Sequence, residues 1–313
     1  MDDNLRIWRK FQLGSLVDIF MLDTRLYDRS ITDLVDGNAA YIEKIKNDAS
    51  RTLMGSRQES WLYRNLIDSA NRGAHWRIIG SQVGMSPFFL SFFLSFFLRG
   101  LIFSNGLPFT AVFSHLNMPV LSGPQTPLNL DAWDGYLANK NRTLKTLYDN
   151  NIDNNIVIAG DSHANWVSDL AWLDHNKYNP TSGAGAIGVE FAGTAITSPS
   201  AFGENVTVDK ANELSKDIVN ANEALLWSEG HYRGYYELRI TPEEVGARFF
   251  GMPTIKDRDA GEVSLANFTV GSGENCLQRN SEGVVGDGVV GSGWLKNGEV
   301  VRTGVVYNNG TGW

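Results

Sequence analysis

The feature that most constrains the fold is a short apolar run that ends in glycine and is followed by an aspartate and a histidine two residues apart. Ile156 to Ala159 are too few for a helix and are bounded by polar residues, so the run predicts a buried β-strand. Gly160 permits a tight turn. Asp161 and His163 are then expected on a loop at the carboxyl end of the strand, where open α/β sheets place their binding sites.

The pair Asp161 and His163 leaves two interpretations open. A carboxylate and an imidazole together suit a hard or borderline metal ion. The same letters also describe an ordinary turn with a capping aspartate and an exposed histidine.

Four further blocks decide how this loop is interpreted. They read L-D-T-R-L-Y, Q-E-S-W-L, H-W-R-I-I-G-S-Q and D-A-W-D-G-Y, at residues 22–27, 58–62, 75–82 and 131–136. With G-D-S-H at residues 160–163, blocks in this order and spacing resemble the PhoD-type alkaline phosphatases, a branch of the metallophosphoesterases. The resemblance runs from about Phe11 to about Gly251.

The resemblance implies an α/β fold of the metallophosphoesterase type, in which two sheets form a β-sandwich flanked by helices. It implies hydrolysis of small phosphate monoesters, and of diesters, at alkaline pH with iron and calcium. Such ions neutralise phosphate charge and lower the pKa of bound water. His163 would bind metal directly, and Asp161 would bind it or orient the histidine. Asp23 and Arg25 would be the catalytic or supporting residues.

Arg25 also has two interpretations. Asp23 and Arg25 follow the apolar run 17–22 at alternating positions, so they share one side if the strand continues. A guanidinium binds phosphate bidentately. It also forms structural salt bridges, with Asp23 or another carboxylate, that resemble a site.

Composition limits the partners. The 313 residues carry a net charge of −8, which disfavours a general nucleic-acid surface, and the single Cys276 excludes an internal disulfide. N-x-S/T sequons fit a secreted glycoprotein and occur at Asn141, Asn205, Asn267 and Asn309. The acidic start shows no signal peptide. We expect a monomer, secreted in its complete form, whose true N-terminus precedes this sequence.

The remaining pattern predicts the other elements coarsely. Strands are expected at residues 76–80 and 187–198, and a hairpin at residues 231–250. Helices are expected at residues 56–70, with Ser56 and Glu59 as a capping box, and at residues 131–149, 167–173 and 211–226. In the second helix, residues 139–142 are expected to form the polar face.

One segment breaks the pattern. From Phe88 to Phe103 the chain is almost continuously apolar, with a near-repeat of F-F-L-S and one arginine. The uninterrupted part is shorter than the 20 or so residues that span a bilayer. We expect residues 83–123 to be an aberrant insertion, such as a translated intron, within a partial PhoD-like domain of residues 1–280. The alternative is a genuine insertion that contacts a membrane. Residues 281–313 are expected to add a strand and a tail.

The resemblance also indicates what is missing. Metallophosphoesterases take most metal ligands from blocks of the type G-D-x-x-Y and N-H-E, and PhoD relatives have these before the D-T-R block, which here begins at Asp23. Two ligands are too few for a multi-metal site. We therefore expect an incomplete domain, its second half, with impaired or no phosphatase activity. The alternative is a non-catalytic remnant that binds a partner.

Overall fold

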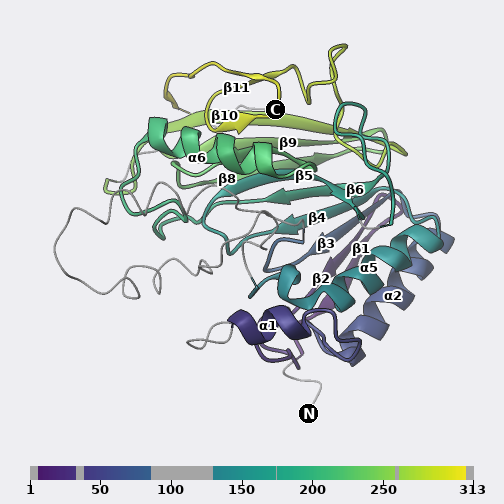
Figure 1. Cartoon of the computed structure of the whole chain (residues 1–313). Coiled ribbons are helices and arrows are strands. Elements are labelled where there is room, and N and C mark those ends of the chain that lie inside the picture. Colours follow the sequence, from purple (N-terminus) through teal and green to yellow (C-terminus); the bar gives the residue numbers. More distant parts are fainter. Residues whose placement is uncertain (1–5, 33–38, 86–129, 174, 258–260, 308–313) are drawn as a thin grey trace, which may run out of the picture.

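The computed structural model describes residues 6–32, 39–85, 130–173, 175–257 and 261–307. An eight-stranded sheet and a four-stranded sheet lie face to face, and helices cover the other side of the larger sheet (Figure 1). The expectation of an α/β architecture is confirmed.

The larger sheet has the strand order β1-β2-β3-β4-β6-β5-β7-β12. Its strands are β1 (Arg9–Leu13), β2 (Val17–Met21), β3 (Trp76–Gly80), β4 (Asn155–Ala159), β5 (Asn165–Ala171), β6 (Ala186–Ala192), β7 (Leu225–Glu229) and β12 (Trp294–Leu295). The four central strands β2, β3, β4 and β6 are mutually parallel. Their carboxyl ends therefore lie at one edge of the sheet.

The smaller sheet has the order β14-β10-β9-β8. Its strands are β8 (Gly234–Ile240), β9 (Glu244–Gly251), β10 (Gly261–Gly271) and β14 (Val306–Tyr307); β11 (Val289–Val290) and β13 (Glu299–Val300) form a separate pair. The β8–β9 hairpin confirms the hairpin predicted at residues 231–250. Residues after 280 supply β12 to the larger sheet and β14 to the smaller one, so this segment joins both layers.

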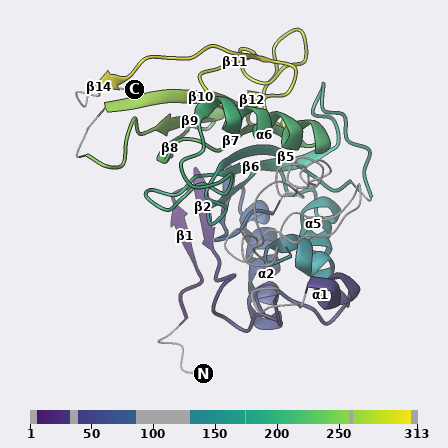
Figure 2. The ribbon, with the colours of Figure 1, turned by 60° about the vertical axis from the view of Figure 1, so that its left-hand side comes forward.

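Side-chain alternation along the strands divides the core between the layers. Ile156 packs between the two sheets with Trp227 and Phe249, whereas Val157 points to the opposite face and packs beneath the helices with Trp133. That face is covered by α2 (Ser56–Asn71), the 3₁₀ turn η2 (Trp133–Tyr136), α5 (Leu137–Asp149) and α6 (Val208–Ala221), and α1 (Ala39–Ile45) lies beside α5. Figure 2 shows α1, α2 and α5 together on one side of the sheet.

The helix predicted at residues 167–173 is wrong. Residues 167–171 belong to β5, which pairs with β6 on one side and β7 on the other and is buried along its whole length. Its apolar residues, Trp166, Val167, Leu170 and Ala171, have a helix-like spacing, and the buried polar pair Ser168 and Asp169 hides the fact that both faces of the strand are covered.

Two details of the predicted helices are also corrected. Gly55 is the N-cap of α2, so Ser56 is already inside the helix, and Glu59 pairs with Arg142 instead of closing a capping box. In α5, Asn139 and Lys140 are buried rather than part of a solvated face, and the Lys140 ammonium pairs with Asp134 at 3.2 Å. The D-A-W-D-G-Y block thus turns inward into the core.

The anomalous segment at residues 88–103 lies outside the described residues, as does most of the predicted insertion 83–123. Among the helices that the structure does describe, none has the length and apolar character needed to cross a bilayer.

Candidate active site

The loops that follow the parallel strands bring the predicted residues to one edge of the sheet. Asp23 and Arg25 follow β2, Gln82 follows β3, and Asp161 and His163 follow β4. This is the position at which α/β sheets bind ligands. The loop after the neighbouring strand β6 reaches the same edge.

The loop after β4 has an unusual backbone. Asp161 and His163 both adopt the left-handed conformation, with φ of 71° and 56°. For a residue other than glycine this conformation costs about 1–3 kcal/mol. Surrounding contacts hold the loop in place: Ser162 accepts a 2.6 Å hydrogen bond from the Trp166 indole, and its backbone N–H donates to the Gly160 carbonyl.

Arg25 is the residue that joins the loops. Its guanidinium forms an ion pair with Asp131 from the D-A-W-D-G-Y block and a second ion pair with Asp161. Asp131 is buried and is also held by Arg29 and the Thr32 hydroxyl. The predicted salt bridge of Arg25 therefore exists, with Asp131 and Asp161 as its partners.

Asp23 lies beneath this arrangement. It is 4% exposed, and its carboxylate accepts hydrogen bonds from the backbone N–H groups of Arg25 (3.2 Å) and Leu26 (2.8 Å). Gln58 and Gln82 hold the same turn through the backbone of Asp23 and Thr24. Asp23 thus shapes the turn that presents Arg25.

His163 has one ring nitrogen fixed. Its Nδ1 lies 3.0 Å from the Pro199 carbonyl oxygen in the loop after β6. Because a carbonyl only accepts, Nδ1 is the donor, and in the neutral ring Nε2 is then the nitrogen with the lone pair that binds metals. The His163 carbonyl accepts a 3.0 Å hydrogen bond from Arg233.

Comparison with known proteins agrees with the predicted resemblance. The family model of PhoD-like phosphatases matches residues 1–249, which is most of the chain. The chain belongs to the PhoD-like phosphatase family. It is 29% identical over 286 residues to alkaline phosphatase D of Bacillus subtilis (strain 168), covering 91% of this chain and 41% of that protein. A solved structure titled "Structure of PhoD" superposes with a TM-score of 0.64 at 25% identity, covering 95% of this chain and 46% of that one.

The chain thus spans less than half the length of the PhoD relatives it matches. The described residues also offer few side chains that could bind a metal ion together. Within the described residues, no group of three or more His, Cys, Asp or Glu side chains is placed to hold one ion. Asp161 and His163 are suitable donor types, but a hard cation takes about six ligands, so these two residues do not form a complete metal site.

Several residues at this edge of the sheet were not predicted from the sequence to belong to the site. Asp131 was part of a matched block, yet its contact with Arg25 spans 106 positions and has no local signature. Glu229 is fully buried at the end of an apolar strand, and burial raises its pKa to about 7. A carboxylate inside an apolar run is the signal that could have identified it.

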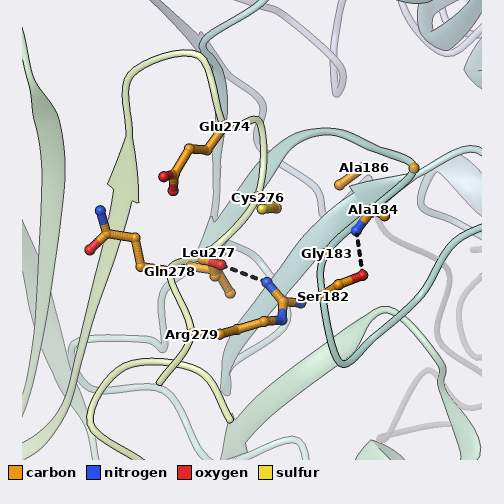
Figure 3. Close-up of a pocket in the computed structure, with 10 residues that line it drawn as sticks. Ser182, Gly183, Ala184, Ala186, Glu274, Cys276, Leu277, Gln278 and Arg279 are labelled. Carbon is orange, nitrogen blue, oxygen red and sulfur yellow. Dashed lines mark hydrogen bonds between the residues drawn. The ribbon is translucent and has the colours of Figure 1, made fainter. Parts of the chain in front are cut away.

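A separate pocket of about 540 Å³ lies away from these loops, lined by the 182–186 loop, which leads into β6, and by residues 274–279 after β10 (Figure 3). It is therefore at the opposite end of β6 from the PhoD-like site. Cys276 faces it, and burial raises the pKa of this thiol to about 11, which makes it unreactive at neutral pH. Arg279 is fully engaged with Asp169 and backbone carbonyls.

Proposed function

We propose that this chain carries part of the site of a metal-dependent phosphate ester hydrolase. Arg25 binds the phosphate group, Asp161 and His163 are metal donors, and Asp23 supports the loop that presents Arg25. The substrate is a small phosphate monoester or diester. A fold of the metallophosphoesterase type, of which this chain holds one part, belongs to the same proposal.

The observation that supports this proposal most is the meeting of Arg25 with Asp161. The two residues are 136 positions apart and come from loops after two different parallel strands. Arg25 is 24% exposed and Asp161 35% exposed, so solvent reaches both side chains. A solvent-accessible guanidinium paired with a carboxylate, two residues from His163 on the same loop, is suited to a phosphate ester with its counter-cation.

Iron and calcium are the metal ions of this proposal because the resemblance to the PhoD-type phosphatases implies them. An imidazole suits iron among other transition metals and a carboxylate suits calcium, so the two donors are compatible with these ions. Water and substrate oxygens would add further ligands. Bound metal would supply charge neutralisation for the phosphate.

The proposal predicts that cation binding depends on the loop after β4. In calorimetric titrations of the purified chain with Ca²⁺ or Mn²⁺, we expect Asp161→Ala and His163→Ala to weaken binding at least tenfold, the equivalent of about 1.4 kcal/mol. The matched control is His175→Ala, an exposed histidine that stacks on Trp172. Equal affinity in all four proteins would refute the roles of Asp161 and His163.

The proposal predicts little turnover by this chain alone. Two protein donors cannot hold a multi-metal centre, so we expect purified residues 1–313 to hydrolyse p-nitrophenyl phosphate slowly or not at all with added iron and calcium. Rapid metal-dependent hydrolysis, abolished by Asp161→Ala, would show that this part of the family's site is sufficient and would overturn the expectation.

A non-catalytic role is the second candidate, favoured by the absence of a three-donor cluster among the described residues. A protein that retains the fold only to bind a partner would show no tight cation binding. In that case Asp161→Ala would change neither binding nor stability beyond the loss of its ion pair with Arg25.

Secretion is part of the proposal, and two sequons are placed to accept a glycan. Asn205 is exposed on the turn that leads into α6, and Asn267 is exposed on β10. Asn141 lies within α5, where its side-chain oxygen accepts a hydrogen bond from the Trp172 indole. Asn309 is outside the described residues.

A further inference from the structure

Two buried residues of opposite charge lie beside the loop of His163. Glu229 is the last residue of β7 and has no exposed surface, and Arg233, just before β8, is 6% exposed. The charge of each favours the charged form of the other, although burial opposes both. Their hydrogen bonds go mostly to backbone groups of the surrounding loops.

Arg233 binds carbonyl oxygens from three loops. One terminal nitrogen donates to the carbonyls of His163 and Ser198, both at 3.0 Å, and the other donates to the Gly230 carbonyl at 3.2 Å. These carbonyls follow β4, β6 and β7 respectively. The planar, rigid guanidinium therefore fixes the spacing of the three loops.

Glu229 binds the complementary N–H groups. Its carboxylate accepts hydrogen bonds from the backbone N–H groups of His231 (2.6 Å) and Tyr232 (3.1 Å) and from the Asn165 side chain (3.1 Å). The oxygen of the Asn165 amide in turn accepts from the Thr194 N–H at 3.0 Å. The same three loops are thus joined a second time.

These contacts control the orientation of the His163 ring. Arg233 holds the His163 carbonyl and the Ser198 carbonyl, and the next residue, Pro199, accepts the hydrogen bond from the His163 ring. The Arg233 guanidinium therefore holds the backbone of His163 and also the loop whose Pro199 carbonyl accepts the hydrogen bond from the His163 ring. The left-handed backbone of His163 needs such support, since it is disfavoured by itself.

Arg233 lies in surroundings that are unfavourable for a charged side chain. Within the described structure its buried Nε has no hydrogen-bond partner, and burial lowers the pKa of the guanidinium. An unsatisfied buried donor normally costs about 1–3 kcal/mol.

We infer that Glu229 and Arg233 form a buried clamp that positions His163 in the site and holds the contact of its Nδ1 with the Pro199 carbonyl, which favours the Nδ1-protonated tautomer of the neutral ring. Both are positioning residues, because neither is placed to touch the substrate. The inference rests on the proposed function in that His163 is the donor being positioned.

The protonation state of the His163 ring tests the clamp. We would record ring ¹H–¹⁵N correlations of the full 313-residue chain without metal or phosphate and assign His163 with His163→Ala. In the wild-type chain we expect the Nδ1-protonated tautomer to predominate. In Arg233→Lys, whose single ammonium cannot span three carbonyls, the tautomer ratio should fall about fivefold, the equivalent of one net hydrogen bond.

Arg279→Lys is the matched control, because the Arg279 side chain is also largely buried and ion-paired but lies away from the site. It should leave the His163 tautomer unchanged. A predominantly Nε2-protonated His163 in the wild-type chain refutes the clamp even if Arg233→Lys does not fold. So does a folded Arg233→Lys with the wild-type ratio. Neither result concerns cation binding, so the clamp and the phosphatase proposal can fail separately.

Discussion

Replacing Arg279 with methionine is expected to lower the free energy of unfolding by about 3–5 kcal/mol at pH 8, because it leaves a buried carboxylate without its counter-ion. Asp169 on β5 has no exposed surface and pairs with Arg279 at 2.6 Å. The same carboxylate accepts hydrogen bonds from the Tyr178 hydroxyl and the Leu277 N–H, both at 2.8 Å. The contacts of Asp169 with Arg279 and Leu277 thus attach the segment after β10 to the larger sheet.

The loss in Arg279→Met should also depend on pH. Burial raises the pKa of Asp169, and Arg279 is what opposes that shift. Without the guanidinium the folded state should prefer the protonated carboxyl, so the destabilisation should be smaller near pH 4 and grow as pH rises.

Urea denaturation of Arg279→Met at both pH values measures this effect. Arg302→Met is the control, since Arg302 and Asp209 form an exposed ion pair whose loss should cost less than about 1 kcal/mol. A similar small loss in both variants would show that the buried pair does not stabilise the fold.

Ionisation of Glu229 is expected to be the second large effect. Burial raises the pKa of this carboxyl from 4.5 to about 7 in the folded protein. The folded state therefore binds the proton more tightly than the unfolded state. Its stability should fall as pH rises from about 4.5 to 7 and level off above 7. At about 1.4 kcal/mol per pH unit, the fall amounts to roughly 3 kcal/mol.

Comparison with Glu229→Gln isolates this contribution, because other titrating groups cancel. The difference in unfolding free energy between the two proteins should change by roughly 3 kcal/mol over the pH range of the shift. Glu282→Gln, in an exposed loop, controls for the loss of one charge. A difference that does not vary with pH would mean that Glu229 titrates normally.

The sequence predicted the elements whose signal is local. β4 and its loop were found from a single apolar run and a glycine, and the β8–β9 hairpin from alternation on both sides of a turn. β5 was missed because it is buried on both faces, and its apolar residues, interrupted by the buried Ser168 and Asp169, follow a helix-like spacing instead of alternating.

The site was predicted only in part for a similar reason. Asp161 and His163 are two residues apart in sequence, so their place on one loop could be inferred. The ion pair between Arg25 and Asp131 joins residues that are more than a hundred positions apart. Arg233 acts through backbone carbonyls, which every residue type has, so the sequence does not identify its partners. Such contacts become visible only in three dimensions.

The most direct test of the proposed site is the anomalous diffraction of crystals of this chain soaked in Mn²⁺. If Asp161 and His163 are metal donors, we expect a peak about 2.0–2.6 Å from both an Asp161 carboxylate oxygen and His163 Nε2. An anomalous map without a peak there, with Asp161 still paired to Arg25 at saturating Mn²⁺, would contradict it.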